Sequence, residues 1–215
     1  MSYDAIMFDL DGTLADTLAD IAAAGNHAFA AVGRPTFPVA DYRTLAGQGL
    51  ERLIRDGLGP EHAGLFDDAC AAFHEYYAVH RYDRTAPYPG VAELLDELVA
   101  RNIRLAVMSN KPDEATVDMV DHVFSRWDFA AVRGHRPGYP VKPNPQAPRE
   151  ICAETGIAPE RWLYVGDTDV DMQTGRRAGF FTVGVTWGFR DEAELRDAGA
   201  DAIIDRPAQF LTLPV

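Results

Sequence analysis

Three features are scarce in this sequence: cysteine, basic residues and long hydrophobic runs. The two cysteines, Cys70 and Cys152, lie far apart in helical-looking segments, so we expect reduced core thiols rather than a disulfide framework. No apolar run approaches the roughly 18 residues of a membrane-spanning helix. The chain passes from Asp4 directly into an apolar segment, without the basic region or cleavage site of a signal peptide. We therefore expect a cytoplasmic protein with no membrane partner.

Acidic residues outnumber basic residues by 33 to 20, which gives a formal net charge of −13. Nucleic acids and anionic membranes bind basic patches, so no nucleic-acid partner is expected. Hydrophobic residues make up 47% of the 215 residues. That composition is sufficient for the core of one large domain, or of a domain with an insertion.

The order of apolar and helical segments predicts an α/β protein. Six short apolar runs have the composition of buried strands, and helical segments separate the last five from one another. We expect these strands at residues 5–8, 103–108, 129–132, 162–165, 181–185 and 202–204. Strands that alternate with helices form a parallel sheet with helices on both faces, so a Rossmann-like fold is predicted.

One long helical segment interrupts this alternation after the first strand. It is rich in alanine, has helical periodicity and contains no convincing strand. Helices are expected at about residues 15–32, 42–55 and 61–80. We expect residues 1–14 and 85–215 to form an α/β core domain, and residues 15–84 to form an inserted all-helical domain.

Polar side chains follow the predicted strands. Asp9 and Asp11 come directly after the first strand, Ser109 and Asn110 follow the second, and Asp167 follows the fourth. In parallel α/β sheets, ligands bind in the crevice outside the carboxyl ends of the strands. These side chains are therefore predicted to meet in one site.

The residue types at these strand ends suit a metal ion and an anion. The carboxylates are ligands that Mg²⁺ accepts, and Ser109 and Asn110 can bind phosphate oxygens through hydroxyl and backbone amide groups. Lys142, in a loop stiffened by prolines, would neutralise the anion and keep a neighbouring carboxylate ionised. If a helix begins near Asp167, Asp171 shares its face and can orient metal-bound water.

Ordinary structural readings of these residues stay open at this point. An Asp-Gly turn can follow a strand, a serine can cap a helix, a lysine is commonly exposed, and acidic residues are favoured at helix N-termini. Phe73, Tyr76 and Tyr77 are expected to pack within their helix rather than to form a substrate cage. None of the six histidines has metal-like spacing.

Four motifs in this order, with a helical insertion after the first, resemble the haloacid dehalogenase superfamily of phosphohydrolases. The motifs are Asp9-Leu10-Asp11-Gly12-Thr13-Leu14, Ser109-Asn110, Lys142-Pro143, and Gly166-Asp167 with Asp171. The resemblance covers nearly the whole chain. Within the superfamily the sequence is most similar to phosphoglycolate phosphatases, at residues 88–91, 109–112, 184–190 and 199–204.

This resemblance implies catalytic and metal-binding roles. Asp9 would be the nucleophile that forms an aspartyl-phosphate. Asp11 would protonate the leaving group and then activate water. Mg²⁺ would be the cofactor, bound by Asp9, by the backbone carbonyl of Asp11 and by Asp167, with Asp171 behind them.

The resemblance also implies substrate-binding roles. Ser109 and Asn110 would hold the transferring phosphoryl group, and Lys142 would stabilise charge on it and on the nucleophile. The helical insertion resembles the family's cap, which closes over the site and selects the substrate. Arg43 and the turn at residues 47–49 are the candidate cap loop that meets the substrate. The expected substrate is a small phosphorylated metabolite, and the expected assembly is a monomer or homodimer.

Several alternatives stay open within and beyond this superfamily. Asp11 argues against a dehalogenase, which has no need of an acid two residues after its nucleophile. Sugar phosphomutases resemble one another in an acid immediately before the metal-binding aspartate, whereas this chain has Gly166 there, which favours a hydrolase. A pyrophosphatase, a nucleotidase and a non-catalytic binding module are the other readings. A binding module would be expected to lack the nucleophile, the acid or the lysine.

Overall fold

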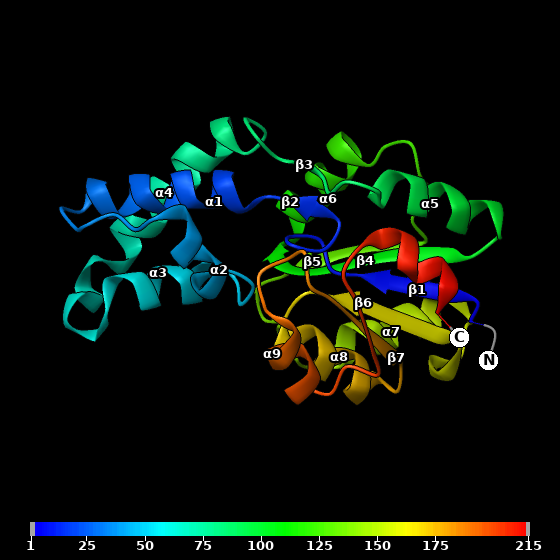
Figure 1. Ribbon diagram of the computed structural model, residues 1–215. Coiled ribbons are helices and arrows are strands. Elements are labelled where there is room, and N and C mark those ends of the chain that lie inside the picture. The colour runs from blue at the N-terminus through cyan, green and yellow to red at the C-terminus, as the bar shows by residue number, and fades with distance from the viewer. Residues whose placement is uncertain (1–2, 214–215) are drawn as a thin grey trace.

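The computed structural model describes residues 3–213, and a six-stranded parallel sheet lies at its centre (Figure 1). The strands are β1 (Ala5–Phe8), β4 (Arg104–Pro112), β5 (Ala131–His135), β6 (Trp162–Gly166), β7 (Phe181–Val185) and β8 (Ala202–Ile204). Their order is β5-β4-β1-β6-β7-β8, which places the first strand of the chain in the middle. The predicted Rossmann-like architecture is confirmed.

Helices cover both faces of this sheet because successive strand residues point to opposite sides. Ile6 and Phe8 pack in one hydrophobic cluster with α5 (Val91–Ala100), α6 (Asp113–Val123) and the 3-10 helix η4 (Pro207–Thr212). Ala5 and Met7 face the other way. They pack with α7 (Gln146–Thr155) and α8 (Asp169–Ala178), on the side where α9 (Glu192–Asp197) also lies (Figure 1).

The inserted helices form a second hydrophobic cluster beside the sheet, at the left of Figure 1. They are α1 (Leu18–Ala31), α2 (Tyr42–Leu45), α3 (Leu50–Leu58) and α4 (Phe66–His80), with 3-10 turns η1 (Val39–Asp41) and η2 (Pro60–Leu65). The single helix expected at residues 42–55 is wrong, because the chain breaks between α2 and α3. Gly47 and Gly49 adopt positive φ angles of 98° and 89° there, a conformation that glycine reaches without steric penalty.

Two short antiparallel strands join the insertion to the sheet. β2 (Ala15–Asp16) pairs with β3 (Ala86–Pro87), so the prediction of no strand after residue 14 is wrong at this point. The buried carboxylate of Asp20 stabilises the same junction: it accepts hydrogen bonds from the backbone N–H groups of Arg84 and Thr85 and from the Thr85 hydroxyl, at 2.8–3.0 Å. We propose this junction as the hinge between core and cap.

The remaining described element is the 3-10 turn η3 (Pro159–Arg161), which leads into β6. Strand β5 begins at Ala131, two residues later than expected, and continues to His135. Among residues 3–213, no helix combines the length and the hydrophobicity that crossing a membrane requires.

Candidate active site

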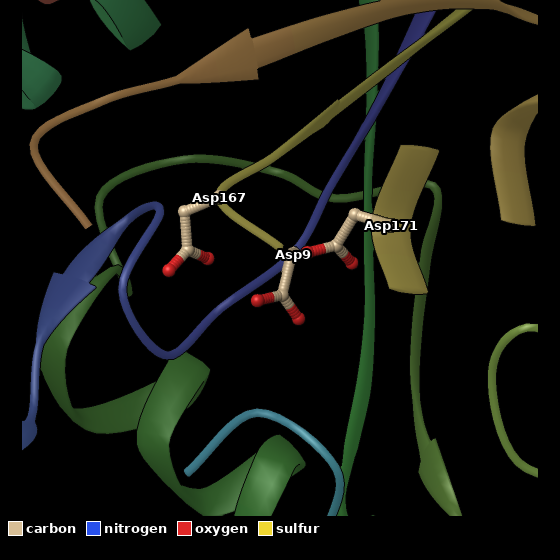
Figure 2. Close-up of side chains that lie close together, drawn as sticks. All are labelled: Asp9, Asp167 and Asp171. Atoms are coloured by element: carbon tan, nitrogen blue, oxygen red, sulfur yellow. The ribbon is translucent and has the colours of Figure 1, made fainter. Parts of the chain in front are cut away.

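The register of the central strands brings the predicted site residues together. Phe8 of β1 pairs with Val107 of β4 on one side and with Val165 of β6 on the other. The segments that follow these three residues therefore lie side by side at the carboxyl edge of the sheet. In the view of Figure 2, Asp9 lies between Asp167 and Asp171.

Three buried carboxylates form the centre of the site. Asp9, Asp167 and Asp171 are at most 5% exposed, and one carboxylate oxygen of each lies within 4.8 Å of the others. One ammonium group pairs with this cluster: Nζ of Lys142 lies 2.6 Å from Oδ1 of Asp9 and 2.7 Å from Oδ1 of Asp171. Three ionised carboxylates carry more negative charge than one lysine neutralises. The cluster is therefore suited to a divalent cation with oxygen ligands.

Burial and the neighbouring carboxylates raise the pKa values of Asp9 and Asp167. Burial, together with Asp171 and Asp167, raises the pKa of Asp9 well above its ordinary value, although Lys142 opposes the shift. Burial and Asp171 raise the pKa of Asp167 to about 7. The prediction that Lys142 keeps its neighbouring carboxylate ionised therefore needs a second cation, which a bound metal would supply.

Asp167 is held in one orientation by its surroundings. Its Oδ1 accepts a hydrogen bond from the Thr13 hydroxyl at 2.9 Å, and its Oδ2 accepts one from the Phe189 backbone N–H at 2.7 Å. A Cβ atom at Gly12 or at Gly188 would lie only 2.3–2.4 Å from Oδ2 of Asp167. The two glycines therefore leave the space that this carboxylate occupies.

Asp171 reaches the site by a different route from the one expected. Helix α8 begins at Asp169, so Asp167 precedes the helix and does not share a helical face with Asp171. Thr168 caps the helix instead, and its N–H and hydroxyl groups donate to Oδ2 of Asp171 at 3.0 and 2.6 Å. Since Oδ1 of Asp171 accepts from Lys142, both oxygens of this carboxylate have protein partners.

Asn110 fixes the loop that carries Lys142. Its Oδ1 accepts a hydrogen bond from the Lys142 backbone N–H at 2.8 Å, and the Lys142 ammonium group also lies 3.4 Å from the Met108 carbonyl. Ser109 is 6% exposed and accepts a hydrogen bond from the Lys111 N–H at 3.2 Å. The predicted residues of the second and third motifs therefore lie against each other, beside Asp9.

A cavity of about 90 Å³ adjoins this cluster, between the sheet and the inserted helices. Asp9, Asp11, Ser109 and Lys111 line it from the sheet side. Ile21, Leu53, Phe73 and Tyr77 line it from the inserted helices. The cavity has the position expected for a small substrate whose phosphate reaches the carboxylates.

The sequence analysis predicted one cation in the site, Lys142, and the structure contains a second, Lys111. Nζ of Lys111 lies 2.8 Å from Oδ1 of Asp11 and donates a hydrogen bond to the Tyr77 hydroxyl, also at 2.8 Å. Burial works to lower the pKa of Lys111, but Asp11 and Tyr77 outweigh it, so the pKa is raised and the side chain stays charged. The signal available in the sequence was the position of Lys111, directly after Ser109 and Asn110.

The predicted cap loop is divided in the structure. Gly47 and Gly49 line the cavity, whereas Arg43 is exposed and is not among the cavity-lining residues of the described chain. The Arg43 guanidinium donates instead to the backbone carbonyl of Gly188 in the core. Arg190 makes the reciprocal contact, since its buried guanidinium donates to the backbone carbonyl of Arg43.

The fold and this cluster define an α/β enzyme whose buried acidic site lies at the carboxyl end of a parallel sheet, next to an inserted helical unit. A family model of haloacid dehalogenase-like hydrolases matches residues 6–185. The chain belongs to that family, and the family predicted from the motifs is confirmed.

Known proteins give the same assignment. A phosphoglycolate phosphatase from Pseudomonas putida is 32% identical over 210 residues, which cover 93% of this chain and 75% of that protein. A phosphoglycolate phosphatase from Pasteurella multocida is 31% identical over 224 residues and 98% of each protein. These relatives support phosphatase activity.

Solved structures agree with the sequence comparison. A predicted phosphoglycolate phosphatase from Haemophilus somnus aligns with a TM-score of 0.91 at 27% identity, over 100% of this chain and 99% of that one. CbbY from Rhodobacter sphaeroides, solved in complex with phosphate, aligns with a TM-score of 0.76 at 26% identity, over 97% and 96%.

Proposed function

We propose that this protein is a Mg²⁺-dependent phosphomonoester hydrolase that works through an aspartyl-phosphate on Asp9. The observation that carries the proposal is the position of Asp9 in the wall of a cavity, beside two further carboxylates and the Lys142 ammonium group. A carboxylate can attack phosphorus only if nearby positive charge offsets the repulsion between two anions. Lys142 supplies part of that charge.

The protein groups around Asp9 match the steps of such a reaction. Oδ1 or Oδ2 of Asp9 attacks phosphorus, the leaving alkoxide departs and takes a proton from Asp11, and water activated by Asp11 then hydrolyses the acyl phosphate. Ser109 and the Asn110 backbone N–H hold the phosphoryl oxygens. The hydrogen bond from the Lys142 backbone N–H to the Asn110 side chain, which holds these two motifs together, supports this assignment.

Mg²⁺ fits the buried carboxylate cluster, whose three negative charges face one lysine. We propose that Asp9, the Asp11 backbone carbonyl and Asp167 hold it, with Asp171 behind them as the partner of Lys142. A bound Mg²⁺ would neutralise charge on the carboxylate and phosphate oxygens as they approach each other.

The proposed substrate is a small phosphorylated metabolite, with 2-phosphoglycolate as the leading candidate. The support is the named activity of the relatives from Pseudomonas putida and Pasteurella multocida, and the bound phosphate of the CbbY structure. The cavity of about 90 Å³ beside Asp9 is compatible with a small molecule of this kind. A contribution of Arg43 to substrate binding, a cytoplasmic location and a monomeric or homodimeric state stay predictions.

The test is phosphate release from a panel of phosphate esters with Mg²⁺, and again with EDTA. The panel contains 2-phosphoglycolate, sugar phosphates, nucleoside monophosphates and pyrophosphate. We expect Mg²⁺-dependent release with a strong preference for 2-phosphoglycolate. Broad, weak release would retain the chemistry and reject the substrate. A product whose phosphate has moved without release would instead indicate a phosphomutase, and no reaction by the folded protein would reject the proposed function.

A further inference from the structure

The chain of contacts from Tyr77 through Lys111 to Asp11 has no role in the function proposed so far. Tyr77 belongs to helix α4 of the insertion, Lys111 to the carboxyl end of β4, and Asp11 to the turn after β1. Both contacts of Nζ of Lys111 measure 2.8 Å. The Lys111 side chain is only 7% exposed, so these partners replace the water that an exposed lysine would bind.

We propose that Lys111 is a positioning residue for Asp11, and that Tyr77 makes this positioning depend on the inserted helices lying over the sheet. The inference rests on the proposed function, because it assigns Lys111 to the acid–base step of that reaction. Asp11 would then be aligned for proton transfer only when helix α4 is docked against the site.

The geometry at Asp11 supports this reading. Its Oδ1 accepts the bond from Lys111, whereas its Oδ2 has no protein donor anywhere in residues 3–213. One oxygen is thus anchored and the other is free to exchange a proton with a leaving group or with water. A proton donor must lie within hydrogen-bond reach of the reacting oxygen, so fixing the carboxylate raises the fraction of productive geometries.

Tyr77 restricts Lys111 through its hydroxyl group. Its hydroxyl accepts a hydrogen bond from Nζ at 2.8 Å, and Nζ lies beside the hydroxyl end of the ring, 5.0 Å from the ring centroid. Tyr77 is 8% exposed and also stacks on Phe73 of the same helix, with ring centroids 5.3 Å apart. Burial and stacking on Phe73 therefore fix the position of the Tyr77 hydroxyl relative to helix α4.

The test compares substrates that differ in their need for a proton. We expect Lys111→Met to lower kcat for 2-phosphoglycolate by about 100-fold, the size of a general-acid contribution, with KM changed by less than about twofold. For p-nitrophenyl phosphate, whose leaving group departs without protonation, the burst of p-nitrophenol that reports formation of the aspartyl-phosphate should slow by under about threefold, whereas later turnover still needs the water that Asp11 activates. Tyr77→Phe should give the same pattern with a smaller loss.

Tyr42→Phe is the matched control for Tyr77→Phe. Tyr42 is a fully buried tyrosine of the same helical unit, and its hydroxyl donates to Oδ1 of Asn26 at 3.0 Å, away from the cavity lining. Its removal should leave both substrates unaffected. Equal slowing of aspartyl-phosphate formation from both substrates would identify Lys111 as merely structural and overturn the proposal. Ethyl phosphate lacks the carboxylate of 2-phosphoglycolate. If Lys111→Met raised KM for 2-phosphoglycolate alone and left kcat unchanged, Lys111 would be a residue that binds the substrate carboxylate, and the proposal would be overturned as well.

A double-mutant cycle provides a second test that does not depend on aryl substrates. If Lys111 acts through Asp11, then Lys111→Met should lower kcat by less than about twofold in an Asp11→Asn background. A full additional loss in that background would overturn the inference. Failure of the inference stays distinguishable from failure of the proposed function, because the latter requires that the wild-type protein release no phosphate.

Discussion

At the scale of single residues, two carboxylates that lie two positions apart have separate partners. Asp9 pairs with Lys142 at 2.6 Å within the acidic cluster, and Asp11 pairs with Lys111 at 2.8 Å on the cavity wall. Each carboxylate pairs one oxygen with a lysine, but only Asp9 belongs to the buried carboxylate cluster that suits a metal ion, where a nucleophile is needed. Asp11 lies outside that cluster on the cavity wall, where an acid can reach a leaving group. The two proposed roles therefore follow from position and not from residue type.

Asp9→Asn tests the nucleophile. The amide keeps the shape of the side chain but cannot form an acyl phosphate, so we expect phosphate release to fall by at least about 1,000-fold while the protein stays folded. Asp169→Asn is the control, since Asp169 lies in the same acidic motif and no partner of its side chain is found within residues 3–213. It should retain activity within about twofold. Substantial turnover by a sequence-verified Asp9→Asn protein would rule out the covalent mechanism.

Gly188→Ala tests the space that Asp167 needs. The added methyl group would lie 2.3–2.4 Å from Cβ and Oδ2 of Asp167 and from the Gly12 backbone carbonyl, so Asp167 must move away from its hydrogen bond with Phe189 and the Gly12 turn must shift with it. We expect at least a tenfold increase in the Mg²⁺ concentration that gives half-maximal activity, the size seen when a group that orients a metal ligand is lost. Gly64→Ala is the matched control, because a methyl group at Gly64 would meet no atom within 4 Å. Equal Mg²⁺ requirements in the two variants would contradict this account.

The sequence predicts that the acidic residues and Lys142 lie in one site, because the carboxyl ends of parallel strands meet at one edge of the sheet. It did not connect Lys111 with Tyr77, since their sequence positions lie in different structural units and only packing of the insertion on the sheet brings them together. Helical periodicity predicts that Tyr77 packs within its helix rather than forming a substrate cage, and the packing is confirmed. Its ring does pack on Phe73, but its hydroxyl reaches Lys111.

At the scale of elements, predictability follows length and periodicity. The long helices and the buried strands have patterns that repeat several times, and they occur close to where the sequence predicts them. The two-residue strands β2 and β3 contain too few residues to show a period. The break between α2 and α3 was indicated only by Gly47 and Gly49, whose spacing is compatible with a turn inside a longer helical segment.

Arg190→Ala tests the contact between the α2 loop and the core. The buried guanidinium donates to the carbonyls of Arg43, Thr44 and Ala46, which follow or end α2 and have no helical partner of their own. Loss of these charge-assisted bonds should lower the free energy of unfolding by about 2–3 kcal/mol in urea titrations. Arg196→Ala removes an arginine whose side chain is 66% exposed and pairs on the surface with Glu192, and it should change stability by under about 0.5 kcal/mol. Similar losses in the two variants would contradict the assignment.

At the scale of the whole molecule, a net charge of −13 would repel an anionic substrate. Salt screens distant surface charges over about 8–10 Å, so the local charges at the cavity decide binding. Lys111 and Lys142 are both buried there, and each is paired with carboxylates. The carboxylates therefore neutralise both lysines. A bound divalent cation would be the most direct way to give the site the positive charge that an anionic substrate needs.

The excess of buried carboxylates over lysines in the site predicts how pH and Mg²⁺ affect the stability of the folded protein. The pKa values of Asp9 and Asp167 are raised in the folded, metal-free protein, with Asp167 at about 7. A carboxyl group whose pKa is higher folded than unfolded stabilises the protein at low pH, and this contribution is lost as the pH rises through the folded pKa. The metal-free protein should therefore lose stability between about pH 5 and 8.

Bound Mg²⁺ reverses this effect because it favours the ionised carboxylates, and its binding displaces protons. Thermal unfolding with EDTA and with saturating Mg²⁺ should give a larger Mg²⁺-dependent rise in Tm at pH 8 than at pH 6. Asp167→Asn should raise the Tm of the metal-free protein at pH 8 and remove most of the Mg²⁺ effect, whereas Asp169→Asn should behave like the wild type. A Mg²⁺ effect that is equal at the two pH values would mean that these carboxyl groups are already ionised without metal. The negative charge of the buried acidic cluster would then have to be neutralised by a group other than Mg²⁺.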